Sequence, residues 1–388
     1  MERGLRKPRV LLLAMSMGKL RFLSTVGLVA AVLILLGMNR ERLNSSIKTA
    51  DDFHLLASYK HSDANKLDKV ASCSSDQMTM IKTQLGSRIS EKTRCPNNSW
   101  LQDYFKQDYK SRTDNKSFIG ISIGCNKGFD AINTARMGMN DPKFDKLLWV
   151  KEMIQNIPQV GAQNILQVGA CKQMLDPQFE ILADEPKRSG EMHCVEPVPS
   201  TAHILHSVRE RLGLDKGSST FEVTKAAVSS ADGTVAFPNV TAGVENANMG
   251  NCKHNCEEVP MYSLQSYVNK FVKNKIDPIN VLSIDVEGFD FDVLFGAGSV
   301  LDRTEYIEFE YHKKGNWINY HIMDTVRLLN GKGFTCYWAG QQKIWRLTEC
   351  DHELYEHWHG WSNVACVHRS QNVLATKMDT LFIDSLKV

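Results

Sequence analysis

The stretch NVLSIDVEGFDFDVLFGA, residues 280–297, decides the fold of this chain. A short apolar run over residues 281–284 ends at the acidic turn DVEG, and apolar residues then recur with helical spacing. This pattern predicts a buried strand, a turn and a helix. In an open α/β sheet, ligands bind just outside the carboxyl ends of the strands, so Asp285 and Glu287 lie where a functional site is expected. The alternative is that these carboxylates only cap the helix and interact with its dipole.

The composition is that of a globular chain with a basic N-terminus. Of the 388 residues, 43% are hydrophobic and 23% are charged, so the chain can bury one large core or two modest ones. The net charge of +2 is too balanced for a dedicated nucleic-acid binder, and we expect no nucleic-acid partner. Basic residues crowd the N-terminus at Arg3, Arg6, Lys7, Arg9, Lys19 and Arg21.

An uncharged segment, FLSTVGLVAAVLILLGM (residues 22–38), follows this basic cluster. As a helix it would span about 25 Å, which suits the thin membranes of the early secretory pathway. The basic flank predicts a cytoplasmic tail over residues 1–21 and a lumenal remainder, as in a single-pass type II protein of the Golgi or endoplasmic reticulum. A cleaved signal peptide and a buried core helix are the alternatives. Arg40 and Arg42 favour a retained signal anchor.

Ten cysteines agree with a lumenal chain, because disulfides persist in an oxidising compartment. Four N-x-Ser/Thr triplets, at Asn44, Asn97, Asn115 and Asn239, agree with the same location. Cys73 and Cys95 are spaced to close one loop by a disulfide. Cys336 and Cys350 flank a turn, and we predict a cross-strand disulfide between them.

Two further clusters resemble metal sites. Cys252 and Cys256 have no second Cys/His pair beside them, so a disulfide or free thiols are favoured over zinc. Histidines gather near the C-terminus at His352, His357 and His359. We expect them to cover one end of the domain, and we predict no metal.

The chain divides into four regions. After the tail and the anchor, we predict a polar stem over residues 39–115 with helical fragments such as residues 76–85, and an α/β domain over residues 116–388. An insertion of about residues 138–190 interrupts this domain.

The domain begins with a strand, a glycine turn and a helix. Residues 118–123 (FIGISI) are β-rich, residues 124–128 (GCNKG) form the turn, and residues 129–137 are helical. Glycines let a backbone approach a ligand closely, although a tight structural turn explains them equally well. Residues 164–170 compete for the role of first strand. We prefer the earlier one because a helix follows it directly.

Later segments continue the alternation. Residues 192–195 form a strand that ends at Glu196. This glutamate either accepts hydrogen bonds from the ribose hydroxyls of a nucleotide or lies in a solvated turn. Ser200 could cap the following helix. Residues 221–228 and 234–237 are predicted to form a hairpin around an Asp-Gly turn. The segment over residues 306–312 alternates, which places Glu308 and Glu310 on one face. A helix over residues 317–329 and a strand over residues 334–338 continue the alternation. Two further strands, residues 343–347 and 362–368, are predicted to finish the sheet as an antiparallel edge.

The order of these pieces resembles the FkbM family of S-adenosylmethionine-dependent methyltransferases. The matching segments are residues 123–128 (IGCNKG), 195–197 (VEP), 226–229 (AAVS) with 232–233 (DG), and 283–289 (SIDVEGF). The resemblance covers about residues 117–369. It implies a Rossmann-like α/β fold with a seven-stranded, mostly parallel methyltransferase sheet and an antiparallel edge.

The resemblance also implies a cofactor site for S-adenosyl-L-methionine. The residues concerned are Gly124, Asn126 and Gly128 around the methionine part, Glu196 at the ribose, Ala227 and Val228 at the adenine, and Asp285 facing the methyl group. The sequence departs from the family pattern at Ser122 and Gln265, where the family usually has acids.

Methyl transfer needs an aligned nucleophilic oxygen and a group that removes its proton. Our hypothesis is that Asp285 or Glu287 takes the proton, while Glu310 and His312 orient a hydroxyl-bearing acceptor, for which a lumenal location suggests a glycan. One alternative is a lumenal glycosyltransferase with a manganese-binding acid pair, at Asp285 and Glu287 or at Asp290 and Asp292. The other, motivated by Ser122, is a membrane-anchored binding module without catalysis.

Overall fold

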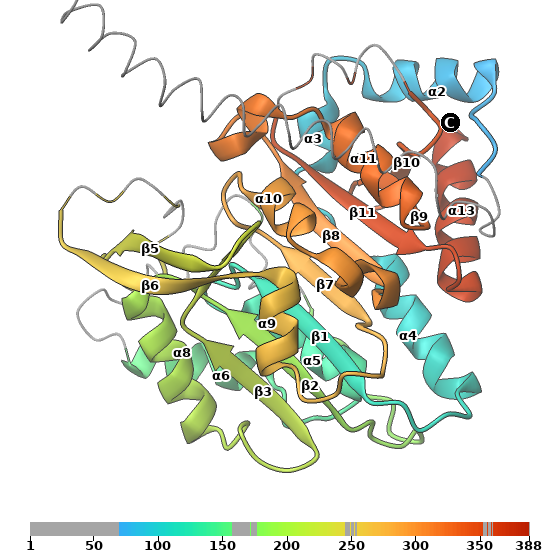
Figure 1. Ribbon diagram of the computed structural model, residues 1–388. Coiled ribbons are helices and arrows are strands. Elements are labelled where there is room, and N and C mark those ends of the chain that lie inside the picture. Colours follow the sequence, from blue (N-terminus) through green and yellow to red (C-terminus); the bar gives the residue numbers. More distant parts are fainter. Residues whose placement is uncertain are drawn as a thin grey trace, which may run out of the picture. The chain divides into compact units, whose positions relative to one another are not determined.

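An eight-stranded mixed sheet forms the centre of the described chain (Figure 1). This computed structural model describes residues 70–156, 171, 177–244, 249, 252, 254–351, 355, 358 and 360–387. The strand order is β10-β9-β11-β8-β7-β1-β2-β3. The strands are β1 (Phe118–Ile123), β2 (Gly190–Val195), β3 (Ser219–Thr224), β7 (Val281–Ile284), β8 (Tyr306–Tyr311), β9 (Phe334–Ala339), β10 (Ile344–Arg346) and β11 (Ser362–His368).

The predicted α/β fold with a mostly parallel sheet is confirmed, and two details of the prediction are wrong. Strands β3, β2, β1, β7 and β8 pair in parallel. The sheet has eight strands instead of seven, and β11 lies between β8 and β9, antiparallel to both, instead of at the edge. β11 is buried along most of its length, as an interior strand must be, whereas the three residues of β10 form the edge.

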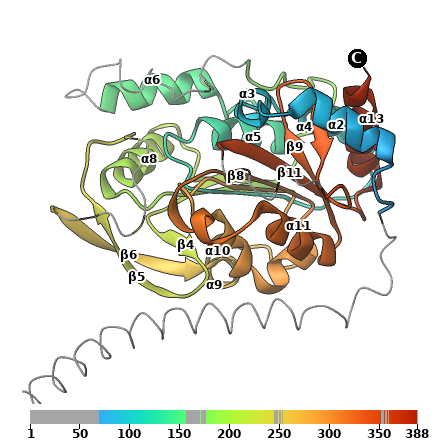
Figure 2. The same ribbon diagram turned by 90° about the horizontal axis from the view of Figure 1, so that it is seen from above.

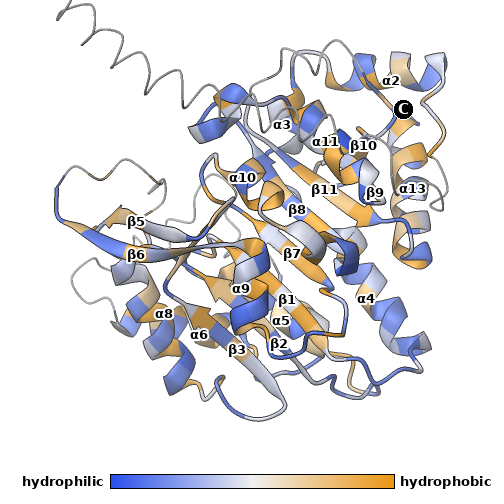
Figure 3. Ribbon diagram, in the orientation of Figure 1, coloured by the Kyte–Doolittle hydropathy of each residue, from blue (hydrophilic) through white to orange (hydrophobic). Residues whose placement is uncertain are grey.

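Helices cover both faces of the sheet (Figure 2). One side carries α2 (Ser75–Leu85), α3 (Ile89–Thr93), α4 (Ser99–Ser111), α5 (Phe129–Met139), α6 (Lys146–Asn156), α8 (Pro199–Arg211) and α13 (Asn372–Leu386). The other side carries α9 (Leu264–Phe271), α10 (Asp290–Phe295) and α11 (Ile322–Gly331), with the short 3-10 turns η2 (Gly298–Arg303) and η3 (Gly315–Asn319) beside them in sequence. Because both faces are covered, β1 is buried at every position, and the central strands are coloured as apolar in Figure 3.

A second, three-stranded sheet has the order β4-β6-β5. Its strands are β4 (Ala227–Ser229), β5 (Gly233–Pro238) and β6 (Cys256–Ser263). The predicted hairpin is therefore wrong, because β4 and β5 each pair with β6 and not with each other. β6 takes this central place by burying Val259 against Ala227, Phe237 and Val198. Ser200 is also no cap, since α8 begins after Val198.

The segment that precedes the sheet, expected as a stem, forms helices α2, α3 and α4 in its described part. α3 contacts β11, and α2 and α4 contact α13. Trp100, Leu101 and Phe105 of α4 are at most 3% exposed. These helices therefore belong to the core of the domain.

Five disulfides join the described cysteines: Cys73–Cys350, Cys95–Cys171, Cys125–Cys194, Cys252–Cys256 and Cys336–Cys366. The disulfide alternative for Cys252 and Cys256 is confirmed. A domain with this many disulfides is typical of an oxidising compartment.

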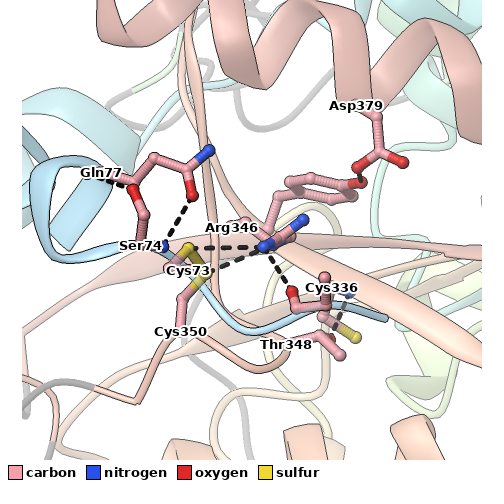
Figure 4. The surroundings of a disulfide bond; sticks show 10 residues. Cys73, Ser74, Gln77, Cys336, Arg346, Thr348, Cys350 and Asp379 are labelled. Atoms are coloured by element: carbon pink, nitrogen blue, oxygen red, sulfur yellow. Dashed lines mark hydrogen bonds between the residues drawn. A yellow bond between two sulfur atoms is a disulfide. The ribbon is translucent and has the colours of Figure 1, made fainter. Parts of the chain in front are cut away.

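The other two predicted pairings are wrong. Cys336 does not pair with Cys350, because β11 inserts beside β9 and makes Cys366 the register partner of Cys336. Cys350 instead binds Cys73, as Figure 4 shows. Arg346 donates from Nε to the Cys350 sulfur over 3.2 Å. The predicted disulfide between Cys73 and Cys95 is therefore also wrong, and Cys95 binds Cys171.

Several sequence-based expectations fall outside the described residues. These are the tail and anchor over residues 1–38, the rival strand over residues 164–170, and the histidines His352, His357 and His359. Within the part of the chain that is described, no helix has both the length and the apolar character needed to cross a membrane. The same part contains no group of three or more side chains suited to hold a metal ion.

Candidate active site

A cavity of about 560 Å³ opens where β1, β2, β7 and β8 end. Its size is within the range of about 300–1,000 Å³ that is usual for small-molecule sites. Every residue expected to act at the site lines it: Gly124, Asn126, Gly128, Glu196, Ala227, Val228, Asp285, Glu287, Glu310 and His312. Apart from Ala227 and Val228, which come from β4 of the second sheet, they meet because the carboxyl ends of parallel strands lie at the same edge of a sheet.

The glycine loop after β1 is wedged between the ends of β2 and β7. Its Gly124 N–H donates to the carbonyl of Val195 over 2.8 Å, and the Asp285 N–H donates to the carbonyl of Ile123 over 2.9 Å. Gly124 has a φ of +74°, and a Cβ there would collide with the carbonyl oxygen of Asp285. The close approach of these two backbones therefore requires glycine.

A disulfide that the sequence analysis missed fixes the same loop. Cys125, which lines the cavity, binds Cys194 of β2. Ser122 of β1 is the register partner of Cys194, so the two cysteines lie at nearly the same height on adjacent strands. No local pattern connects Cys125 to Cys194, and the pairing follows only from the register of β1 and β2.

Glu196 lies at the tip of β2 and is only 4% exposed, which excludes the solvated turn. Its Oε2 accepts the N–H of Asn126 and its Oε1 accepts the N–H of Val198, both over 2.9 Å. Burial raises the pKa of Glu196 to about 7. Each carboxylate oxygen keeps a further lone pair for a hydroxyl donor.

The acidic turn after β7 presents two carboxyls with different surroundings. Asp285 is exposed and lines the cavity. Glu287 has a left-handed backbone with φ of +54° and binds Lys314 Nζ over 2.8 Å. Asp290 is fully buried, and burial together with the charge of Asp285 raises its pKa well above the usual range. Of Asp285 and Asp290, only Asp285 lines the cavity.

The alternative acid pair is poorly placed for a metal. Neither Asp290 nor Asp292 is among the residues that line the cavity. Both carboxylate oxygens of Asp292 accept from Asn316 Nδ2, over 3.0 Å.

The end of β8 supplies hydrogen-bond donors. Burial raises the pKa of Glu310 to about 8, so this carboxyl is mostly protonated at neutral pH. Burial lowers the pKa of His312 to about 4, so its ring is neutral. Because His312 Nδ1 accepts the Lys314 N–H over 3.1 Å, the ring proton is assigned to Nε2. That buried Nε2 has no hydrogen-bond partner.

The two departures from the family pattern lie in different places. Ser122 lines the cavity, at the end of β1. Gln265 lies outside the lining, where its Oε1 accepts the N–H of Ser299 over 2.8 Å. The departure at Gln265 therefore leaves the cavity unchanged.

Comparison with known families identifies the domain. Residues 167–336 match the family model of the methyltransferase FkbM domain. The chain carries an FkbM methyltransferase domain. FkbM methyltransferases use S-adenosylmethionine, so the protein is a methyltransferase dependent on this cofactor. No curated protein and no solved structure matches the chain significantly.

The matched range of the FkbM domain contains Glu196, Asp285 and His312, whereas Gly124 and its loop precede it. The match therefore does not cover β1, although β1 lies between β7 and β2 in the centre of the sheet. The match selects a methyltransferase over the glycosyltransferase that the sequence left open.

The cavity offers polar and apolar groups that match the parts of S-adenosylmethionine. Asn126 Oδ1 is buried without a hydrogen-bond partner and could accept from the ammonium group. Glu196 could accept from the ribose hydroxyls. Ala226, Ala227 and Val228, each at most 4% exposed, offer an apolar surface for the adenine.

Cofactor affinity should depend on pH through Glu196. In the protein without cofactor, burial raises the pKa of Glu196 to about 7. Hydrogen bonds from ribose hydroxyls favour the ionised carboxylate. Cofactor binding should therefore weaken as the pH falls through about 7 and Glu196 becomes protonated. Calorimetric titration with S-adenosylhomocysteine on either side of this pH measures the effect. Glu196→Gln should bind weakly and without this pH dependence, whereas Glu257→Gln, in an exposed ion pair with Lys225, should behave like the wild type. A wild-type affinity that is independent of pH would contradict this role.

Proposed function

We propose that the protein is an O-methyltransferase that acts in the lumen of the secretory pathway, with a glycan hydroxyl as its acceptor. The observation that carries the proposal is the meeting of two unlike sets of groups in one cavity. Glu196 and the Gly124 loop suit a nucleoside, and Asp285, Glu310 and His312 suit a hydroxyl. The five disulfides support the lumenal location.

The cofactor supplies an electrophilic methyl group on a sulfonium sulfur. When bound, it would pass this methyl group to the acceptor oxygen and keep the electron pair of the broken carbon–sulfur bond, leaving as S-adenosylhomocysteine. We assign the acceptor's proton to the carboxylate of Asp285, because Asp285 is exposed and lines the cavity, whereas Asp290 is buried outside its lining. Glu287 is engaged by Lys314, which makes it the second choice.

Donors at the end of β8 orient the acceptor in this proposal. His312 presents a proton on Nε2 and cannot act as the base, because its Nδ1 lone pair is already used. Glu310 is protonated at neutral pH and also donates. Two donors aimed at the acceptor oxygen would leave its own proton directed toward Asp285.

Location and anchoring belong to the same proposal. Residues 22–38 would anchor the protein in the membrane of the Golgi or endoplasmic reticulum, with residues 1–21 in the cytoplasm and the remainder in the lumen, including the helices α2 to α4 that pack on the domain. The basic N-terminal cluster supports this orientation.

One experiment tests activity and topology together. Full-length protein in sealed microsomes is given labelled S-adenosylmethionine and a soluble glycan, with and without detergent. We expect label in the glycan only after detergent opens the vesicles, and we expect S-adenosylhomocysteine to bind the purified protein. Transfer in sealed vesicles would refute the lumenal location. Label in proteins or small molecules alone would refute the glycan acceptor, and absence of cofactor binding would favour the non-catalytic module.

A further inference from the structure

One wall of the cavity comes from a segment far upstream of the family match. The link between α3 and α4 lines the cavity with Cys95, Pro96, Asn97 and Asn98. It is held in place by the disulfide Cys95–Cys171. At the start of α4, Trp100 Nε1 donates to the hydroxyl of Tyr306 over 3.2 Å. The segment is therefore a fixed part of the site.

Asn98 connects this wall to the sheet. Its backbone is left-handed, with φ of +49°, and its Nδ2 donates to Glu308 Oε2 over 2.8 Å. Its Oδ1 is buried and has no hydrogen-bond partner. A buried acceptor without a donor is unfavourable, so a ligand that brings a hydroxyl donor would be stabilised here.

Glu308 belongs to a polar row that crosses the sheet. In the register of the parallel strands, Ser122 of β1 lies beside Ser283 of β7, which lies beside Glu308 of β8. All three line the cavity. Hydrogen bonds from Ser283, Asn98 and Tyr306 hold the Glu308 carboxyl. Glu308 and Glu310, two residues apart on one strand, share this face.

The chemistry of these groups selects the ligand. Two residues that line the cavity carry buried polar atoms without a hydrogen-bond partner, the acceptor Asn98 Oδ1 and the donor His312 Nε2. A cation would satisfy only the acceptor, and an anion would satisfy only the donor. Hydroxyl groups both donate and accept. Trp361 also lines the cavity, and its ring would offer an apolar surface to one face of a pyranose.

We propose that Asn98 and Glu308 form a sugar subsite that binds neighbouring hydroxyls of a pyranose acceptor, so that the segment before the family match sets acceptor specificity. This inference rests on the proposed function and names the part of the site that recognises the sugar. The sugar would lie against β8 and the α3–α4 link, with its reactive hydroxyl toward Asp285.

The variant Asn98→Gly tests the subsite, because glycine keeps the left-handed backbone while the amide is removed. It also leaves the Asn97-x-Ser99 triplet intact. Asn255→Gly is the matched control, since Asn255 has a φ of +51° and lies outside the cavity lining. The probes are methyl glycosides of the common hexoses and of N-acetylglucosamine. Their binding is followed by calorimetry in the presence of S-adenosylhomocysteine, and their methylation by label transfer.

We expect Asn98→Gly to weaken glycoside binding and raise the acceptor KM by about tenfold, the scale of one lost hydrogen bond. The S-adenosylhomocysteine affinity and the melting temperature should match those of Asn255→Gly. Glu308→Gln should act in the same direction, and the double variant should lose less than the product of the two effects, because the side chains are bonded.

Two outcomes would overturn the subsite. The first is unchanged glycoside affinity in Asn98→Gly, and the second is a loss of cofactor affinity with acceptor binding intact. If the wild type binds glycosides through Asn98 but transfers no methyl group, the subsite stands and the proposed function fails. If it methylates a different class of hydroxyl compound and binds none of the glycosides, the subsite fails.

Discussion

Asp285→Asn is expected to lower kcat by about 10²–10⁴-fold, the range that a positioned general base contributes. The amide keeps the shape of the side chain but cannot take the acceptor's proton. Because Glu196 and the Gly124 loop are untouched, the affinity for S-adenosylhomocysteine should stay within a few-fold of the wild type. Label transfer and calorimetric titration of the same preparations measure the two effects.

Asp292→Asn is the matched control, since it is the same change in the adjoining helix α10 and outside the cavity lining. It should retain most of the activity. If Asp285→Asn also remained active, the base would lie elsewhere, and Glu287→Gln would be the next variant to measure.

Gly124→Ala is expected to abolish cofactor binding and to lower the free energy of unfolding strongly. The new methyl group would collide with the Asp285 carbonyl, and the backbone at φ of +74° disfavours any side chain. Either the glycine loop or the acidic turn would have to move, and both line the cavity. Denaturant unfolding and titration with S-adenosylhomocysteine measure the two losses.

Gly213→Ala separates the collision from the backbone strain. Gly213 has a φ of +62°, and nothing lies within 4 Å of the position of a Cβ. This control should lose about 1–2 kcal/mol, the cost of a left-handed residue, and keep its cofactor affinity. If the two variants were equally stable and bound the cofactor equally well, the close contact between Gly124 and Asp285 would be unimportant.

The central strands could be predicted because their signals are local. An apolar run that ends in Gly124 or Asp285 and leads into a helix needs no knowledge of distant residues. The position of β11 could not be predicted, since it depends on which strands lie side by side. The wrong pairing of Cys336 followed from that error, because Cys366 becomes its neighbour only when β11 lies beside β9.

The cofactor side of the site was also more predictable than the acceptor side. Glu196 and Asp285 lie at strand ends, and strand ends converge in a parallel sheet. Asn98 belongs to a polar stretch without a strand signal, and its contact with Glu308 spans 210 positions of sequence. The protonation of Glu310 and Asp290 also depends on burial by residues that no local pattern connects to them.

The covalent bridges have a practical consequence for anyone who produces this domain. A fragment trimmed to the limits of the family match, residues 167–336, would lack β1 and β11. It would also leave Cys171, Cys194 and Cys336 without their disulfide partners, which lie outside those limits. Exposed thiols and a sheet missing its middle strand favour aggregation, so expression should start before Cys73 and continue past α13.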